Sequence, residues 1–252
     1  MDGKGLKYRI YVASYKRPQL AKTHKYLREI VYVVMESEEE EYKKLGVKVW
    51  AIPDEVQGNL ARVWNYILDN AKEKNIVLMD DDINYFGRWN GNKDKRLKEE
   101  DVYQMIQEGM LLATDLGVKY WGVNCLKDKG AYREYTPFGT VHYIGGPFQA
   151  HMDNPLRYDE ALFLKEDYDM TLQVLNEYRK NLRLNMYHYV CEQNTLHGGV
   201  AAYRNVDTEM EQNKRLQRKW GKRIIAFDKS NKSGKEKEYD INPILKIPIK
   251  GV

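Results

Sequence analysis

The stretch Ile76-Val77-Leu78-Met79-Asp80-Asp81-Asp82 decides how the rest of the sequence is interpreted. Its four apolar residues predict a buried strand, and three adjacent aspartates follow it. Adjacent carboxylates repel one another and Asp is depleted in strands, so folding alone gives no reason for this cluster. A hard divalent cation bound to phosphates requires oxygen ligands presented together, and ligands in α/β folds gather at the carboxyl ends of strands. The stretch therefore predicts a metal-assisted phosphate site, with a solvated turn after the strand as the structural alternative.

Strands and helices alternate on either side of this stretch. Strands are predicted at residues 8–13, 30–35 and 47–52, one helix is expected to begin after Ser37, and another after Asn59. Further on, the polar residues 88–98 predict a mobile loop, residues 141–146 a strand, and residues 166–179 and 208–220 helices. This alternation with short connections predicts an α/β fold, with a mostly parallel central sheet and helices on both faces.

Composition places the chain among ordinary globular proteins. It has 252 residues, of which 42% are hydrophobic and 31% charged, with a net charge of +4. We expect no membrane partner, because no apolar run approaches the ~18 residues of a spanning helix, and a cytoplasmic location, because Cys125 and Cys191 show no metal or disulfide pattern. Basic residues gather near the carboxyl end: Lys214, Arg215, Arg218, Lys219, Lys222, Arg223, Lys229, Lys232, Lys235 and Lys237. Such a cluster attracts phosphate backbones, although most charge runs are simply solvated.

Four motifs follow one another in a fixed order. They are Val12-Ala13-Ser14-Tyr15-Lys16-Arg17-Pro18, Gly58-Asn59-Leu60-Ala61-Arg62-Val63-Trp64-Asn65, Val77-Leu78-Met79-Asp80-Asp81-Asp82, and Gly145-Gly146 with Lys165-Glu166-Asp167-Tyr168-Asp169, beyond which lies His197-Gly198-Gly199. Together they resemble the nucleotide-sugar glycosyltransferases of GT-A fold, especially family-2-like members. The resemblance implies a Rossmann-like GT-A domain over residues 1–206, with a nucleotide-binding half over 1–85 and an acceptor half over 86–206. A basic helix and tail over 207–252 would complete the single domain.

The resemblance also implies roles for individual residues. Asp82 and Asp80 would bind Mn²⁺ or Mg²⁺, with His197 as a further metal ligand, and Asp80 and Asp81 would contact the ribose or sugar of a UDP-sugar donor. The remaining donor contacts would be Ser14, Tyr15, Arg17, Arg62, Asn65, Gly145 and Gly146. Asp167, paired with Glu166, would be the catalytic base, with Asp169 in reserve. Each has a plain alternative: turn, helix cap or surface residue.

A narrower resemblance concerns the acceptor. The Asp triplet, the segment Lys165–Asp169 and the segment Asn194–Gly199 resemble the phage-encoded TET-associated glycosyltransferases, a group linked to adding sugars to 5-hydroxymethylpyrimidines in DNA. This implies a DNA acceptor, the host cytoplasm as location, and phosphate contacts at Lys93–Arg96 and Lys214–Arg223. The alternatives are a saccharide or protein acceptor, a sugar nucleotidyltransferase, a metal-dependent nuclease and a noncatalytic nucleic-acid-binding protein. The oligomeric state is left open.

Overall fold

The strand that carries the Asp triplet lies inside a large sheet. The computed structural model of the chain describes residues 5–125, 127, 132–191, 204–227 and 242–247. Strand β4 (Asn75–Asp80) pairs in parallel with β1 (Arg9–Ala13), so that Asp80 lies opposite Ala13. Outward from β1 follow β2 (Ile30–Met35) and β3 (Lys48–Ile52), both parallel. The carboxyl ends of these strands therefore meet at one edge of the sheet.

The other half of the sheet mixes directions. From β4 the order continues through β9 (Phe148–Met152), β7 (Tyr120–Asn124), β10 (Leu182–Cys191), β5 (Ile83–Asn90) and β6 (Lys93–Arg96), while β8 (Phe138–Gly139) pairs with β10. β7 and β10 are parallel, whereas β9 runs antiparallel to β4 and β7. Because β9 is reversed, its start lies at the same edge as the end of β4, and Asp80 N donates to Pro147 O at 3.3 Å.

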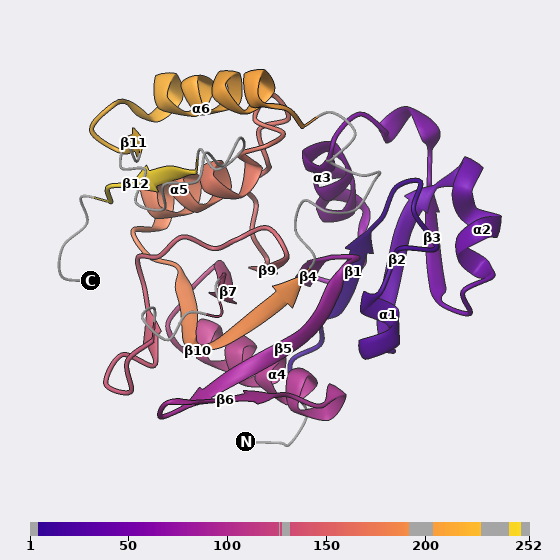
Figure 1. Cartoon of the computed structure of the whole chain (residues 1–252), viewed down its shortest axis with the longest axis horizontal. Helices are drawn as coiled ribbons and strands as arrows, with labels where there is room; N and C mark the ends of the chain where they lie inside the picture. The colour runs from indigo at the N-terminus through magenta and orange to yellow at the C-terminus, as the bar shows by residue number, and fades with distance from the viewer. Residues whose placement is uncertain (1–4, 126, 128–131, 192–203, 228–241, 248–252) are drawn as a thin grey trace.

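Helices cover both faces, as the sequence predicts (Figure 1). One face packs against α1 (Thr23–Tyr26), η1 (Glu36–Glu38), α2 (Glu39–Lys43) and α4 (Glu99–Asp115). The other packs against α3 (Leu60–Asn70), which follows η2 (Asp54–Val56), and against α5 (Glu166–Tyr178). Outside α5 lie α6 (Val206–Trp220) and the small sheet β11 (Ile225–Phe227) and β12 (Pro243–Leu245), around a cluster that includes Leu162, Leu172 and Leu216. The α/β prediction is confirmed.

Three local predictions meet different outcomes. Asn59 caps α3, since its Oδ1 accepts from Arg62 N at 3.1 Å, as expected. The predicted Ser37 cap is wrong: Ser37 lies inside η1, and its hydroxyl donates to Asp54 at 2.8 Å. The predicted strand at 141–146 is also wrong, because side chains of α5 satisfy this backbone instead of a ladder: Ile144 N donates to Thr171 Oγ1 at 3.2 Å.

The predicted mobile loop at residues 88–98 is wrong as well. β5 and β6 form an antiparallel hairpin that turns at Gly91, where φ is +56°. Trp89 of β5 is buried, and Asp94 forms an ion pair with Lys127 at 2.8 Å and lies 3.3 Å from His188 Nε2. The polar composition of the segment concealed these inward-facing side chains, so its sequence looked like a loop.

Candidate active site

Asp80 and Asp82 lie at the carboxyl end of β4. Asp80 is the last residue of β4, and Asp81 and Asp82 form the turn into β5. Asp80 is half-buried and Asp82 is 7% exposed. Burial raises the pKa of Asp80 well above its usual value, and the charges of Asp82 and Asp81 raise it further. The turn therefore concentrates negative charge where a cation would relieve it.

Asp81 has a different environment from its two neighbours. Its carboxylate is fully buried and accepts from Arg17 Nε at 2.9 Å, from the second Arg17 nitrogen at 2.5 Å, and from the Ser14 hydroxyl. Its backbone oxygen accepts from Lys22 N at 2.7 Å and from Thr23 N at 3.0 Å. The structure thus brings Ser14 and Arg17 to the triplet, where Asp81 holds the loop after β1 and the start of α1.

The loop after β1 is fixed from its other side by η1 and α2. The Ser14 hydroxyl lies 2.5 Å from the Tyr42 hydroxyl, and Lys16 N donates to the buried carboxylate of Glu38 at 2.6 Å. Lys16 has a φ of +52°, which turns the chain sharply at this point. Tyr15 remains half-exposed, with the Lys16 ammonium 5.0 Å from its ring centre. A ring on a fixed loop beside the triplet can stack on a nucleotide base.

Gly145 and Gly146 lie in the turn before β9, next to Asp167. The Asp167 Oδ2 atom accepts from Gly146 N at 3.0 Å and from the Tyr143 hydroxyl at 2.5 Å, and Oδ1 accepts from Tyr168 N at 2.8 Å. A Cβ on Gly145 would lie 2.5 Å from the Tyr189 hydroxyl, so no larger residue fits there without a shift. Glycine at this position lets the turn pack closely against Tyr189 of β10 and against Cys125, which follows β7.

The triplet and the Glu166–Asp167 pair share one electrostatic environment. Burial raises the pKa of Glu166 well above its usual value, and the charges of Asp167 and Asp80 add to this rise. Burial also raises the pKa of Asp167, although the Tyr143 hydrogen bond and the charge of Lys165 oppose it. Motifs about 80 positions apart in sequence are linked by the turn before β9, where Asp80 N donates to Pro147 O and Gly146 N donates to Asp167.

Arg62 and Asn65 are engaged with the backbone on the outer side of α3. Arg62 donates to Glu55 O at 2.8 Å and to Gln57 O at 3.3 Å, and it lies 3.8 Å from a carboxylate oxygen of Glu160. Asn65 is bonded at both ends of its amide to the backbone of Tyr158, at 2.9 and 2.8 Å. These contacts fasten the residue 157–162 segment to α3, and the structure does not bring these two side chains to the triplet.

Comparison with known families identifies the group to which these motifs belong. Residues 8–199 match the model of the TET-associated glycosyltransferase family. The chain belongs to that family. The matched range contains the triplet and the Glu166–Asp167 pair, so the resemblance predicted from the motifs is confirmed, and with it the glycosyltransferase class. No curated protein matches the chain.

Solved structures support the fold of this family member. A mannosyltransferase from Pyrobaculum calidifontis, in complex with GDP-Man and Mn²⁺, is 12% identical with a TM-score of 0.55 over 86% of this chain and 65% of its own. Glucosyl-3-phosphoglycerate synthase from Mycobacterium tuberculosis, in complex with Mn²⁺, UDP-glucose and phosphoglyceric acid, is 8% identical with a TM-score of 0.52 over 89% and 84%. TarS 1–349 from S. aureus is 12% identical with a TM-score of 0.45 over 84% and 66%. The chain spans about two thirds of the length of the TarS and mannosyltransferase structures. The fold is that of the GT-A glycosyltransferases.

The donor set at the triplet fits a hard divalent cation. In the described part of the chain, no cluster of three or more His, Cys, Asp or Glu side chains is arranged around a metal position. Asp80 and Asp82 nevertheless present carboxylate oxygens at one turn, and Mg²⁺ and Mn²⁺ commonly take one or two carboxylates while substrate phosphates and water supply the rest. His197, the further ligand expected from the sequence, lies outside the described residues.

Two residues of this site were given no role of their own from the sequence. Tyr143 bonds the candidate base Asp167 and stacks on Tyr168 with ring centres 4.2 Å apart. Lys165, next to Glu166, is 1% exposed and pairs with Glu209 of α6 at 2.6 Å. Both depend on contacts between residues distant in sequence. Adjacency to the Glu-Asp motif was the one available hint for Lys165.

Asp169, the reserve candidate for the base, is fully buried and engaged by α6. Its carboxylate accepts from Trp220 Nε1 at 2.7 Å and from Lys219 Nζ at 2.9 Å. This arrangement fits a structural tie between α5 and α6.

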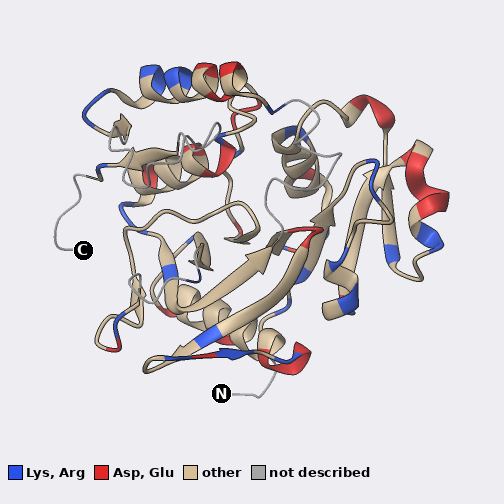
Figure 2. Cartoon of the chain, viewed as in Figure 1, with Lys and Arg blue, Asp and Glu red and all other residues tan. Residues whose placement is uncertain are grey.

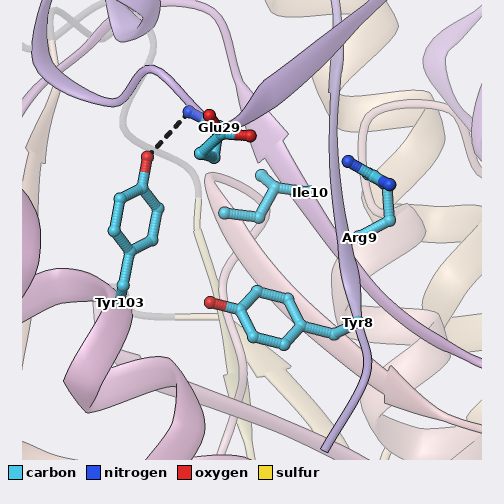
Figure 3. A pocket seen from close by; sticks show the side chains of 5 residues that line it. All are labelled: Tyr8, Arg9, Ile10, Glu29 and Tyr103. Atoms are coloured by element: carbon cyan, nitrogen blue, oxygen red, sulfur yellow. Dashed lines mark hydrogen bonds between the residues drawn. The ribbon is translucent and has the colours of Figure 1, made fainter.

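A hollow of about 260 Å³ lies at the opposite edge of the sheet (Figure 3). It is lined by Tyr8, Arg9, Ile10, Glu29 and Tyr103, at the amino ends of β1 and β2. Tyr103 spans it by accepting from Glu29 N at 2.8 Å. Since the triplet stands at the carboxyl ends of the same strands, this hollow is separate from the candidate active site.

No helix among the described residues has the length and apolarity to span a bilayer.

Proposed function

We propose that this protein is a metal-dependent glycosyltransferase that moves a sugar from a UDP-sugar to a hydroxyl acceptor, and that the acceptor is a 5-hydroxymethylpyrimidine in phage DNA. One observation carries the proposal: the β4–β5 turn and the Glu166–Asp167 pair both contact the turn before β9, where Asp80 N donates to Pro147 O at 3.3 Å and Gly146 N donates to Asp167 at 3.0 Å. A transferase needs a site for the departing diphosphate beside a base for the incoming hydroxyl. Family membership favours this function over a nuclease or a noncatalytic binding protein.

The donor half of the site supports UDP-sugar binding. Tyr15 offers a stacking surface for the base, while Arg17 and Ser14 are held by Asp81 at the edge of the triplet. Asp80 and Asp82 would hold Mn²⁺ or Mg²⁺, which supplies positive charge to the departing diphosphate. The mannosyltransferase and the phosphoglycerate synthase with the same fold were solved with nucleotide sugars and Mn²⁺. His197 stays a predicted ligand.

Asp167 suits the role of base that accepts the proton of the acceptor hydroxyl. A carboxylate offers about four hydrogen-bond acceptor positions, and Tyr143, Gly146 N and Tyr168 N use three of them. These donors fix the orientation of the carboxylate, and one acceptor position is left for substrate. A single base opposite the departing nucleotide corresponds to an inverting reaction.

The acceptor is proposed from the family. The matched family is called the TET-associated glycosyltransferases. The resemblance of the sequence to that group implies a 5-hydroxymethylpyrimidine in DNA as the acceptor. In a duplex this base would have to leave the stack before its hydroxymethyl group could reach Asp167. A saccharide or protein acceptor is the alternative that the test must separate.

The test is a donor and acceptor panel. The protein is incubated with Mn²⁺ and a set of UDP-sugars, with and without DNA containing 5-hydroxymethylcytosine, and UDP release and DNA mass are measured. We expect slow UDP release without DNA, faster release with it, and a mass gain of one sugar per modified base. Asp82→Ala should lose Mn²⁺-dependent UDP binding, whereas Asp115→Ala, on the far end of α4, should keep it. Release of pyrophosphate from a nucleoside triphosphate, or no response to any UDP-sugar, would refute the proposal.

A further inference from the structure

Helix α6 has two faces with different partners. The inward face contacts the segment that leads into α5: Gln212 and Arg215 both donate to Ala161 O, at 3.1 and 2.9 Å. Lys219 pairs with Asp159 at 2.8 Å as well as with Asp169. Two members of the basic cluster, Arg215 and Lys219, therefore bind acceptors within this protein.

The outward face leaves a second group of cations in solvent. Lys214, Arg218, Lys222 and Arg223 are all exposed, and none forms an ion pair within the described part of the chain. We call these four residues the outer stripe. Lys214 and Arg218 are one helical turn apart, a spacing at which like charges repel by a few tenths of a kcal/mol. The helix dipole favours cations in the last turn of a helix. Lys222 and Arg223 lie beyond Trp220, the last residue of α6, so the dipole does not account for them.

Charge on α6 is segregated along its length (Figure 2). Asp207 and Glu209 lie in its first turn, and Arg218 and Lys219 in its last. Glu209 is buried against Lys165, so it does not neutralise the outer stripe. The result is a compact positive surface at the carboxyl end of α6, beside the small sheet of β11 and β12.

We propose that the outer stripe is the surface on which a DNA backbone docks, and that the inward contacts of α6 hold this surface at a fixed position relative to Asp167. The inference rests on the proposed function and adds to it the place where the acceptor is held. Unpaired cations on a rigid helix suit phosphates, which are bound mainly through charge. Asp169 links α6 to the helix that carries Asp167, so a docked strand would keep its register with the base.

An anionic membrane would require a different surface. Helices that lie on membranes expose large apolar side chains beside their cations. On α6, Leu216 is fully buried and Trp220 packs into the cluster below it, so the apolar side is already covered. Met210 is the large exposed apolar residue of this helix, and it lies in the acidic half.

The β5–β6 hairpin offers an internal comparison. Lys93 and Lys95 are exposed on edge strand β6 and form no ion pair with a described residue. In Figure 1 this hairpin lies at the opposite end of the molecule from α6, and β5 leads away from Asp82 towards its tip. Removing two charges here changes the net charge by the same amount as removing two from the outer stripe.

The experiment compares Lys214→Gln/Arg218→Gln with Lys93→Gln/Lys95→Gln. Binding of a fluorescent duplex containing 5-hydroxymethylcytosine is measured at several salt concentrations, along with UDP release in the absence of DNA. For the outer-stripe variant we expect the slope of log affinity against log salt to fall by about 2, because each lost phosphate contact removes about 0.9. Sugar transfer to DNA should fall in parallel, while UDP release and melting temperature stay unchanged. The sequence predicts phosphate contacts at Lys93–Arg96 too, but β5 carries this hairpin away from Asp82, so the hairpin variant should keep the wild-type slope.

Three outcomes would overturn the docking surface. An equal loss of slope in both variants would indicate that net charge, and not this particular surface, determines DNA binding. An unchanged slope in the outer-stripe variant would place the phosphate contacts elsewhere. Salt-sensitive binding to phosphatidylglycerol vesicles, lost in the outer-stripe variant while DNA binding persists, would assign the surface to a membrane. Failure of the proposed function is a separate result: the wild-type protein would then release no UDP from any donor.

Discussion

At the scale of single residues, three neighbouring aspartates occupy three environments. Asp81 is turned into the protein to pair with Arg17 and Ser14, whereas Asp80 is half-buried at the strand end and Asp82 follows in the turn. A buried carboxylate without a partner would be costly, so the Arg17 pair is what makes the middle position possible. Because the carboxylate of Asp81 is engaged by Arg17 and Ser14, the flanking residues, and not the middle one, are the two that suit a cation.

Replacement of Asp167 by Asn tests the assignment of the base. The amide keeps the size of the side chain but cannot accept the hydroxyl proton, so we expect donor affinity to persist and turnover to fall by about 10²- to 10⁴-fold. Calorimetric UDP-sugar binding and the rate of sugar transfer measure the two effects. Asp207→Asn, in the first turn of α6, is the matched control. A variant with normal turnover and normal donor affinity would remove Asp167 from the chemistry.

Sequence reasoning at this scale located the triplet and the Glu-Asp pair but not the direction of every side chain. The motif order predicted donor contacts for Arg62 and Asn65, yet their hydrogen bonds run to carbonyls of the preceding loop and to Tyr158, 93 positions away from Asn65. Spacing on a helix fixes which residues share a face, whereas the packing partner of that face is set by the tertiary fold. Tyr143 was missed for the same reason.

At the scale of elements, α6 is joined to α5 by a buried ion pair. Lys165 and Glu209 are 1% and 2% exposed, and their atoms lie 2.6 Å apart. Arg204, which precedes α6, contacts the other oxygen of Glu209 at 2.5 Å. Glu209 therefore connects the start of α6 to the residue just before the Glu166–Asp167 pair, and the position of the first turn of α5 depends on it.

Glu209→Ala should be strongly destabilising. It leaves the Lys165 charge buried without its partner, for which a loss of about 3–5 kcal/mol in the free energy of unfolding is typical. Urea unfolding followed by circular dichroism measures the loss, and the double variant Lys165→Met/Glu209→Leu should recover much of it. Glu211→Ala, on the exposed side of the same helix, should have little effect. Equal stability of the Glu209 and Glu211 variants would mean that the ion pair contributes nothing.

Element prediction succeeded where hydrophobic pattern and local caps agree. β2 occupies the predicted residues 30–35, and α3 begins at its predicted Asn59 cap. β5, β6 and β9 were missed because their stability comes from neighbours distant in sequence. β9 is inserted between β4 and β7, and β5 of the β5–β6 hairpin pairs with β10. Such pairings leave a weak local signature in the sequence.

At the scale of the whole molecule, one continuous sheet connects the parallel strands beside the triplet to the mixed half that begins at β9. The parallel strands β1 and β4 deliver the triplet, and the reversed strand β9 brings Gly146 and then Asp167 to the same edge. Beneath that turn runs a buried polar network, in which Gln149 bonds Gly146 O at 3.1 Å, and Tyr158 bonds both Gln149 and His151, at 2.8 and 2.9 Å. The site therefore depends on the global fold, and conditions that weaken this network should weaken the entire protein.

Acid should act on the molecule through His151 in that network. Burial, with a smaller contribution from Arg157, lowers the pKa of His151 from 6.5 to about 3. Above pH 6.5 the imidazole is neutral in both states and pH has no effect through it. Between pH 6.5 and 3 the unfolded chain binds a proton that the folded chain does not, so the free energy of unfolding falls as pH falls, by about 2 kcal/mol at pH 5. Buried carboxylates with raised pKa values, such as Glu166, act in the opposite direction, so the comparison must isolate the histidine.

Urea unfolding at pH 7.5 and pH 5 should show that wild type loses about 2 kcal/mol more than His151→Gln, whose side chain does not titrate. Parallel losses in the two proteins would show that His151 is protonated in the folded state.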